Sequence, residues 1–272
     1  LPFQLKGIVI WLTLRGKTIL ITGASSGIGE YVAYEAATMG ANLVLCARRE
    51  DNLLNVKANC EQLGDGHIYT IPVDLTDPDS MDYMIQELEL QNIEIDTLIN
   101  NAGFGHSEPF VTTNFDVVLN LFQVNVLGLM YLTQNLAIKM LDQGHGQIIN
   151  VASLAGKVST PNYATYGATK GAVISFSNAL RMELKPHNIQ VTTVNFGPVD
   201  TPFFDRIARN RKEASLNGPF ALTVQKAAKV IIDTIGTKKR EVNRPLLLAI
   251  GAKLYDLVPD VGDYILMNFY RD

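Results

Sequence analysis

Short apolar runs alternate along this chain with longer segments whose apolar residues recur every three or four positions. The short runs are continuous and rich in β-branched residues, which is typical of strands buried in a parallel sheet. The longer segments have the period of amphipathic helices. We predict strands at 17–22, 41–47, 68–73, 95–99, 147–151 and 189–195, and helices at 30–39, 53–63, 81–90, 115–141, 166–184 and 224–235. This alternation predicts an α/β fold with a doubly wound, mostly parallel sheet and helices on both faces.

A glycine-rich turn joins the first predicted strand to the first helix. Its sequence, TGASSGIG at 22–29, places three glycines in a GxxxGxG spacing. Glycines there let the backbone approach a pyrophosphate, and the free N–H groups of the helix N-terminus face the anion. The strand before and the helix after provide the context of a Rossmann-type dinucleotide site. The predicted contacts are Gly23, Ser25, Ser26, Gly27, Ile28 and Gly29.

Two arginines, Arg48 and Arg49, follow the second predicted strand, where an NAD-binding protein usually has an acidic residue. A guanidinium matches the 2′-phosphate of NADP with forked donors. We therefore predict NADP(H) over NAD(H) as the cofactor. The alternative is that both arginines belong to a solvated helix start, and Ser26 adds no second positive charge to the glycine turn.

Three further segments are predicted to line the cofactor. Asp74 follows the third strand, where it can accept a hydrogen bond from an adenine amino group or cap the turn at 77–78. Small residues after the fourth strand would let the backbone lie beneath the cofactor, while an asparagine ties neighbouring strands. A turn after the sixth strand would grip the nicotinamide carboxamide. The segment after the fourth strand contributes Asn101, Ala102 and Gly103, and the turn after the sixth strand contributes Gly197, Val199 and Thr201.

Tyr166 and Lys170 are four residues apart in a predicted helix, so their side chains share one face. An ordinary tyrosine has a pKa near ~10, and a neighbouring ammonium favours the phenolate and lowers that pKa. Ser153 follows the fifth strand, at the sheet edge where open α/β sheets bind ligands. We predict that Ser153 holds a substrate oxygen while Tyr166 gives or takes its proton. A YxxxK pair alone is a weak signal, but the serine and the upstream glycine turn make it specific.

Asn125 lies on a largely apolar helix surface, so it should be buried and must find hydrogen-bond partners. One interpretation is structural: the side chain satisfies the backbone at a helix distortion, beside Gly128. The other is functional: it lies near Lys170 and holds a water that relays protons. The two interpretations are compatible.

The net charge of −4 gives no indication of a nucleic-acid surface. Two cysteines, Cys46 and Cys60, are too few for a disulfide framework and indicate a reducing, cytoplasmic setting. The four histidines are scattered, so we expect no metal site. The apolar run at 8–14 is far shorter than the ~20 residues that a membrane span needs. We expect it to pack against the domain, with an interfacial membrane anchor as the second-ranked alternative.

Together these motifs resemble the short-chain dehydrogenase/reductase family over residues 17–201. They are TGASSGIG, NNAG at 100–103, Asn125, Ser153, YGATK at 166–170 and GPVDT at 197–201, in the family's order. The chain is more loosely similar to hydroxysteroid dehydrogenase-like and uncharacterised bacterial members. One departure is Phe196, where the family usually has proline before the glycine.

The resemblance implies a catalytic tetrad of Asn125, Ser153, Tyr166 and Lys170, with Lys170 also binding the nicotinamide ribose. It also implies a homodimer or homotetramer joined through the helices at 115–141 and 166–184. We expect one domain, with a cofactor-binding and catalytic core at 17–201, a substrate loop at 202–222 and a C-terminal tail at 245–272. The two apolar stretches of the tail cover the pocket, build a dimer interface or touch lipid.

The expected function is NADP(H)-dependent reduction of a carbonyl, or oxidation of an alcohol, on a small hydrophobic substrate. Phe203, Phe204, Ile207 and Phe220 in the substrate loop favour an apolar cover over one suited to sugars. Two alternatives stay open. One is a non-catalytic nucleotide-sensing or scaffold protein on the same fold. The other is a reductase of steroid or lipid ketones at a membrane surface.

Overall fold

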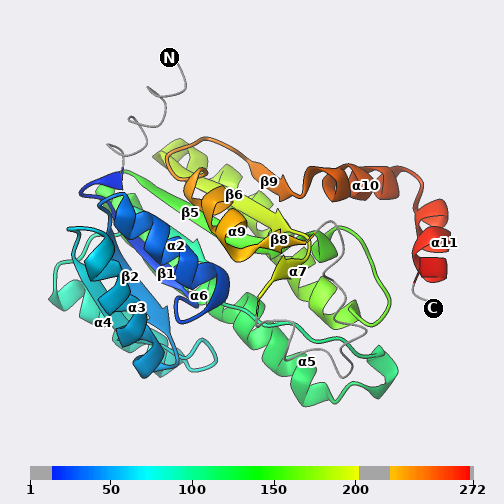
Figure 1. Ribbon diagram of the computed structural model, residues 1–272, viewed down its shortest axis with the longest axis horizontal. Coiled ribbons are helices and arrows are strands. Elements are labelled where there is room, and N and C mark those ends of the chain that lie inside the picture. The colour runs from blue at the N-terminus through cyan, green and yellow to red at the C-terminus, as the bar shows by residue number, and fades with distance from the viewer. Residues whose placement is uncertain (1–13, 202–220, 270–272) are drawn as a thin grey trace.

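The computed structural model describes residues 14–201 and 221–269. Within these ranges seven parallel strands form one sheet in the order β3-β2-β1-β4-β5-β6-β9 (Figure 1). The strands are β1 (Thr18–Thr22), β2 (Asn42–Ala47), β3 (Ile68–Pro72), β4 (Thr97–Asn100), β5 (Gly146–Ser153), β6 (Ile189–Phe196) and β9 (Glu241–Arg244). The predicted doubly wound parallel sheet is thus confirmed. The predicted segments 8–14 and 202–222 lie almost wholly outside the described residues.

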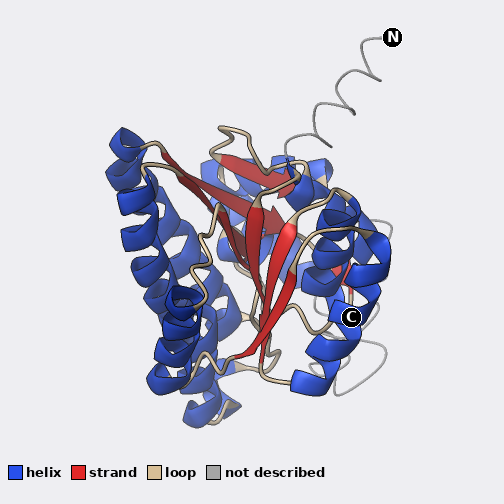
Figure 2. Cartoon of the chain, turned by 90° about the vertical axis from the view of Figure 1, so that its left-hand side faces the viewer, coloured by secondary structure: helices blue, strands red, loops and turns tan. Residues whose placement is uncertain are grey.

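Helices cover both faces of the sheet, which lies between them when the molecule is turned by 90° (Figure 2). One face packs against α2 (Gly27–Thr38), α3 (Glu50–Leu63) and α9 (Val224–Ile232). The other packs against α4 (Pro78–Leu90), α6 (Leu129–Gln143) and α7 (Ala164–Leu184). The period of two along each strand explains this, because Ile19 and Ile21 enter the first core and Leu20 enters the second.

The predicted long helix at 115–141 is divided in the structure. It begins as α5 (Phe115–Phe122), widens into a π-helix, η2 (Gln123–Gly128), and continues as α6. Gly128 permits the distortion to pack closely, since a Cβ there would lie 2.5 Å from the carbonyl oxygen of Leu75. Short 3₁₀ turns lie at η1 (Phe110–Thr112), η3 (Leu154–Gly156) and η4 (Lys185–His187).

Strand β9 and the short strands β7 (Val199–Asp200) and β8 (Leu222–Thr223) were not predicted from the sequence. β9 has the sequence EVNR, which is too short and polar to give a strand signal, and it adds to the edge of the sheet beside β6. It leads into α10 (Leu246–Leu257) and α11 (Pro259–Phe269). These two helices extend away from the sheet in Figure 1.

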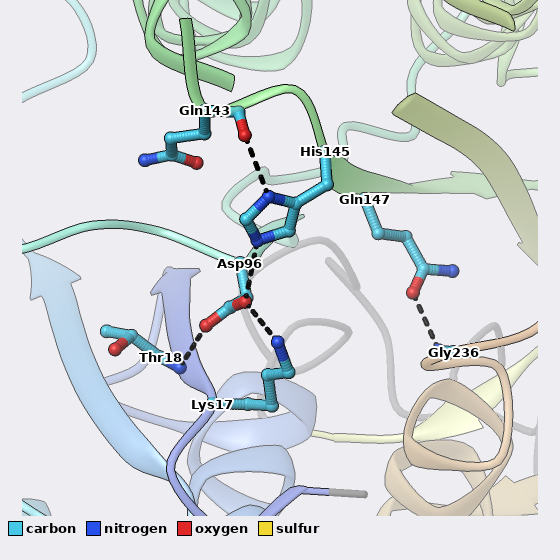
Figure 3. Close-up of polar contacts among 7 residues, drawn as sticks. All are labelled: Lys17, Thr18, Asp96, Gln143, His145, Gln147 and Gly236. Atoms are coloured by element: carbon cyan, nitrogen blue, oxygen red, sulfur yellow. Dashed lines mark hydrogen bonds and ion pairs between the residues drawn. The ribbon is translucent and has the colours of Figure 1, made fainter. Parts of the chain in front are cut away.

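The amino ends of the central strands are joined by a carboxylate, Asp96, immediately before β4 (Figure 3). It accepts hydrogen bonds from the Lys17 ammonium at 2.7 Å and the Thr18 backbone N–H at 2.9 Å. The His145 ring lies 3.3 Å from the same carboxylate. Beside it, the Gln147 side chain accepts from the Gly236 backbone N–H at 2.8 Å. This end of the sheet is therefore held by polar contacts, and the carboxyl end is left for ligands.

Candidate active site

A cavity of about 1360 Å³ lies at the carboxyl ends of the strands. It runs from Arg48 and Asp74 at one end, past Ser153 and Tyr166, to residues of α10 and α11 at the other. Nearly all the predicted site residues line it; the exceptions are Gly29 and Asn125. The sheet edge predicted from the strand–turn pattern is thus where the structure has its cavity.

The glycine turn has the backbone geometry that only glycine adopts without strain. Gly23 and Gly27 have φ values of +67° and +61°. A Cβ on Gly29 would lie 2.4 Å from the carbonyl oxygen of Gly23, so this position has room only for hydrogen. The first turn of α2 therefore begins against the cavity, with its unpaired N–H groups available to an anion.

A second strand end fixes the glycine turn in place. The Asn101 side chain donates to the carbonyl oxygens of Thr22 at 3.1 Å and Gly23 at 3.4 Å. In return, the Thr22 hydroxyl accepts from the backbone N–H groups of Asn101 and Ala102, both at 3.0 Å. The prediction that an asparagine ties neighbouring strands is confirmed, and the turn after β4 lies directly beside the glycine turn.

Positive charge gathers at the end of β2. Arg49 donates from one guanidinium nitrogen to the hydroxyls of Ser25 and Ser26, each at 3.3 Å. Arg48 and Arg49 are both exposed and both line the cavity. Arg49 also directly precedes the first residue of α3, so its backbone belongs to a helix start, as the alternative interpretation expected. Its side chain nevertheless reaches the glycine turn.

Asp74 lines the cavity, but its carboxylate already has partners. One oxygen accepts from the backbone N–H of Thr76 at 2.9 Å and from the Thr76 hydroxyl at 2.8 Å. Asp77, rather than Asp74, caps α4. The contacts of Asp74 are therefore those of a turn-forming residue. Its hydrogen bond to an adenine amino group stays a prediction. On the far side, Thr201 lies beside Gly27, within 3.7 Å of where a Cβ would be.

Ser153 is the last residue of β5, and its hydroxyl lies between a neighbouring strand and the cavity. It donates to the carbonyl oxygen of Phe196 at 3.2 Å and accepts from the backbone N–H of Ala155 at 3.1 Å. A hydrogen bond also joins Ser153 to the Tyr166 hydroxyl. The two hydroxyl groups predicted to handle one substrate oxygen are therefore in contact.

Burial controls the titration of the tyrosine. It raises the pKa of Tyr166 from 10.0 to about 12, although the hydrogen bond with Ser153 acts in the opposite direction. The expectation that Lys170 lowers this pKa is wrong for the structure described here. The Lys170 nitrogen lies 5.9 Å from the centre of the Tyr166 ring, and desolvation of the phenol outweighs every favourable contact.

Lys170 is buried against the strand that carries Ser153. Its ammonium donates to the carbonyl oxygen of Val151 at 3.1 Å. Burial lowers its pKa from 10.5 to about 8, because the charged form loses its hydration. At neutral pH the amine is still largely protonated, and it lies in the cavity wall one helical turn from Tyr166.

Asn125 occupies the π-helix, where its side chain satisfies the backbone of the neighbouring loop. It accepts from the Phe104 N–H at 3.0 Å and donates to the Phe104 carbonyl at 2.8 Å. It also donates to the hydroxyl of Thr169 at 3.2 Å. The structural interpretation is confirmed in part: Asn125 lies in a helix distortion, but the backbone that its side chain satisfies is that of Phe104. A Cβ on Gly103 would lie 2.9 Å from the Asn125 oxygen and 3.6 Å from the Lys170 nitrogen, so both groups border Gly103.

Comparison with known proteins settles the family. A family model described as short chain dehydrogenase matches residues 17–212. The chain belongs to this family. Short-chain dehydrogenases are oxidoreductases that bind NAD(P) and act on small molecules, and the glycine turn and cavity fit that description.

Two relatives and one solved structure show how far the likeness extends. This short-chain dehydrogenase is 34% identical over 256 residues to 11-beta-hydroxysteroid dehydrogenase-like 2 of Arabidopsis thaliana, covering 93% of this chain and 81% of that protein. It is 33% identical over 261 residues to a fatty acyl-CoA reductase of Acinetobacter baylyi, covering 93% and 84%. A short-chain dehydrogenase from Sphingobium yanoikuyae in complex with NADPH matches with a TM-score of 0.79 and 28% identity, covering 90% of this chain and 94% of that one.

Phe196, where this short-chain dehydrogenase departs from the family pattern, is buried. The backbone N–H of Gly197 donates to the carbonyl oxygen of Arg244 in β9 at 2.8 Å. β9 therefore holds the turn from its outer side. Because sequence analysis missed β9, it also missed this support.

A buried chain of polar side chains was missed as well. Asn100 donates to Asn150 at 2.8 Å and to Thr133 at 2.9 Å. Asn150 in turn donates to the hydroxyl of Ser177 at 2.8 Å. Two asparagines at matching positions of neighbouring apolar strands were the available signal. Among residues 14–201 and 221–269, no cluster of potential metal ligands is present.

Proposed function

We propose that this short-chain dehydrogenase is an NADP(H)-dependent oxidoreductase that reduces a carbonyl, or oxidises an alcohol, on a small hydrophobic substrate. The observation that carries the proposal is the contact between the Ser153 and Tyr166 hydroxyls in a cavity that also contains the glycine turn. A substrate oxygen bound beside both hydroxyls would meet one donor that orients it and one that exchanges its proton.

The proposed roles follow from these contacts. Ser153 turns its hydroxyl from the Phe196 carbonyl to the substrate oxygen, and Tyr166 donates its proton to that oxygen during reduction. A phenol whose pKa is raised to about 12 is protonated at pH 7, which is the form that reduction requires. Lys170 lines the same cavity, where its ammonium would bind the nicotinamide ribose, as the family resemblance implies. A bound nicotinamide cofactor supplies or accepts the hydride.

The residues present fit a dinucleotide with a 2′-phosphate. Gly23, Gly27 and Gly29 let the backbone turn tightly at the start of α2, whose first N–H groups would face a pyrophosphate. Arg49 reaches the hydroxyls of Ser25 and Ser26, so a positive charge and two donors lie together next to Arg48. A phosphate binds favourably to such a group. These contacts support NADP(H) over NAD(H).

The experiment that tests the proposal is NADPH oxidation with a panel of hydrophobic aldehydes and ketones. We expect a lower Michaelis constant for NADPH than for NADH. Tyr166→Phe should lower kcat by about 10²- to 10⁴-fold, the usual contribution of a general acid, while leaving the NADPH dissociation constant nearly unchanged. Tyr163→Phe is the matched control, because that ring also lines the cavity and lies 6.4 Å from the Tyr166 ring.

Three results would contradict parts of the proposal. Equal turnover by Tyr166→Phe and the wild type would remove Tyr166 as the proton donor. A clear preference for NADH would remove the role of the two arginines. NADPH binding without hydride transfer to any carbonyl would instead support the nucleotide-sensing or scaffold alternative.

Two exposed apolar surfaces support proposals about partners. On α5 and α6, large apolar side chains such as Phe115, Leu119 and Ile138 are more than half exposed. We propose that a second copy of the chain covers this face together with α7, giving a homodimer or homotetramer.

The cysteines Cys46 and Cys60 are both free, which fits the proposed cytoplasmic setting.

The second-ranked proposal is contact with a membrane surface. Several apolar residues of α10, α11 and the junction between them are more than half exposed and also line the cavity; they are Leu247, Leu254, Val258, Val261 and Ile265. An apolar rim around the cavity would let a lipid-soluble substrate enter directly from a bilayer. A ketone reductase at a membrane surface is therefore the alternative to a wholly cytoplasmic enzyme.

A further inference from the structure

Helices α10 and α11 form the wall of the cavity opposite the glycine turn. Leu248, Gly251, Ala252 and Tyr255 line it from α10, and Ile265 lines it from α11. These side chains contribute hardly any polar atoms. A substrate held at Ser153 therefore extends from a polar reacting centre into apolar surroundings.

The first turn of α10 lies close to the reacting centre. A Cβ on Gly197 would be 3.0 Å from Leu248 and 3.2 Å from Pro245. Gly197 directly follows Phe196, whose carbonyl oxygen accepts the hydrogen bond of Ser153. A group attached to a carbonyl carbon at Ser153 would therefore lie along α10.

Gly251 leaves a notch in the middle of this helix. Gly251 is exposed, and a Cβ added there would extend into open space, with no atom within 4 Å. Leu248 and Leu254 are three residues to either side and Tyr255 is four residues on, so larger side chains flank the notch on the same face. The space opens into the cavity, because Gly251 is one of its lining residues.

No requirement of the backbone explains this glycine. Glycine is unfavourable within a helix, and the φ of Gly251 is not in the left-handed region. Gly262 in α11 differs, since a Cβ there would lie 2.3 Å from the Tyr255 ring. Gly262 therefore allows α11 to pack on α10, and a hydrogen bond from the Tyr255 hydroxyl to Asp263 at 2.7 Å holds the pair together. Gly251 has no such neighbour.

We infer that Gly251 is a specificity-determining residue: its notch on α10 receives an extended apolar group of the substrate, next to the carbonyl held at Ser153. This inference rests on the proposed carbonyl reductase function and specifies its substrate class. Large apolar ketones fill the notch and gain from the burial, whereas short ketones do not reach it.

The test compares Gly251→Phe with Gly251→Ala and the wild type. Each protein is assayed with a short methyl ketone, a long-chain methyl ketone and a fused-ring methyl ketone. Gly251→Phe should lower the ratio of kcat/KM for a large ketone to that for the short ketone by about 10-fold or more, the size of effect that a filled apolar pocket produces. Gly251→Ala should lower it less. If the kcat/KM ratio falls for only one of the two large ketones, the shape of that ketone is the one that the notch accepts.

The matched control is Ile250→Phe, which places a phenyl ring on a different face of α10. Ile250 does not line the cavity and instead borders a shallow hollow beside β9 with Lys253. The Ile250→Phe variant should leave the ratio of kcat/KM for large and short ketones unchanged. The NADPH dissociation constant shows whether each variant is folded. An unchanged ratio in Gly251→Phe for both large ketones, or an equal fall in Ile250→Phe, would overturn the inference.

A binding measurement separates failure of the notch from failure of the proposed function. If the wild type binds NADPH but reduces none of the three ketones, the proposed function is wrong. The notch is then judged by the fluorescence of cis-parinaric acid, a polyene fatty acid that becomes bright in apolar sites. Weaker binding by Gly251→Phe than by Ile250→Phe supports the notch, and equal binding overturns it.

Discussion

Tyr166 and Lys170 have titration properties that follow from burial rather than from their mutual spacing. Burial favours the neutral form of each, so the phenol pKa rises to about 12 and the amine pKa falls to about 8. At pH 7 the pair offers a protonated phenol beside a largely charged amine. This arrangement suits proton donation to a carbonyl oxygen.

The lowered pKa of Lys170 predicts how stability changes with pH. The folded protein releases this proton near pH 8, whereas the unfolded chain keeps it until about pH 10.5. Between these values the unfolded state binds more protons, so the contribution of Lys170 to the free energy of unfolding increases with pH, by about 2 kcal/mol from pH 8 to 10. Urea denaturation of the cofactor-free protein measures it.

The control for this measurement is Lys170→Met, compared with the wild type at each pH. Burial raises the pKa values of Cys46 and Cys60 from 9.0 to about 12, and these thiols lower stability as the pH rises above 9. They are present in both proteins, so their effect cancels in the difference. A difference that stays flat between pH 8 and 10 would contradict the assignment to Lys170.

The sequence supplied the identity of the site residues more readily than their contacts. The spacing of Tyr166 and Lys170, and the position of Ser153 after a strand, brought all three to one cavity wall. The direction of the Tyr166 shift could not be predicted in this way, because it depends on how completely the surrounding elements exclude water. For Asp74 the sequence left two interpretations, a contact with adenine and a role in forming a turn. Only the structure shows that its carboxylate binds Thr76 in the turn.

At the scale of elements, the Asp96 carboxylate ties the start of β1 to the start of β4 at the end of the sheet remote from the cavity (Figure 3). Asp96→Ala leaves the Thr18 N–H and the Lys17 ammonium without this acceptor. We expect the free energy of unfolding to fall by about 1–3 kcal/mol, the usual cost of a lost partner in a partly buried network. The NADPH dissociation constant should not change.

Asp65→Ala serves as the control for this prediction. Asp65 pairs with Arg15 at 3.0 Å, but both side chains are more than 60% exposed. Exposed pairs contribute about 0–1 kcal/mol, so this substitution should have the smaller effect on chemical denaturation. An equal loss in the two variants would mean that Asp96 acts only as an ordinary surface charge.

Most elements could be predicted because their apolar periods are strong. The six predicted helices and the first six strands differ from the expected ranges by only a few residues at their ends, apart from the division of the helix predicted at 115–141. Helices α10 and α11 were expected only as two apolar stretches of a tail. β9 could not be predicted, because only Val242 of its four residues is buried. The π-helix at Asn125 was expected only as an unspecified distortion, since the widened turn depends on contacts with Phe104 and Thr169 that no local pattern encodes.

At the scale of the whole molecule, two exposed apolar surfaces need an explanation, one on the helical stretch Phe115–Gln143 and one on α10 and α11. The helical stretch Phe115–Gln143 is long and apolar enough to cross a membrane, with a mean hydropathy of 1.5. In this fold it packs against the sheet and α7, and its exposed side is the face on which we propose that a second copy of the chain binds. The apolar rim on α10 and α11 surrounds the cavity and is the surface better suited to lipid.

Flotation with phosphatidylcholine vesicles tests the lipid contact. Residues 246–269 contain Lys253 and three aspartates, so anionic lipid should not attract them. Contact with a bilayer predicts that the protein floats with neutral vesicles, independently of salt, and that Leu254→Glu combined with Ile265→Glu reduces flotation by about 10-fold. Recovery of the wild type entirely in the pellet fractions would leave the cytoplasmic enzyme as the proposal.

The paired amides of Asn100 and Asn150 have a consequence for assembly of the site. The two residues are directly opposite each other in the register of β4 and β5, and Ser153 lies three residues beyond Asn150. A slip of one residue between these strands would move the serine by about 3.3 Å and would separate the two amides. A wrong strand offset would therefore cost this buried hydrogen bond at the same time as it displaced the reactive hydroxyl of Ser153.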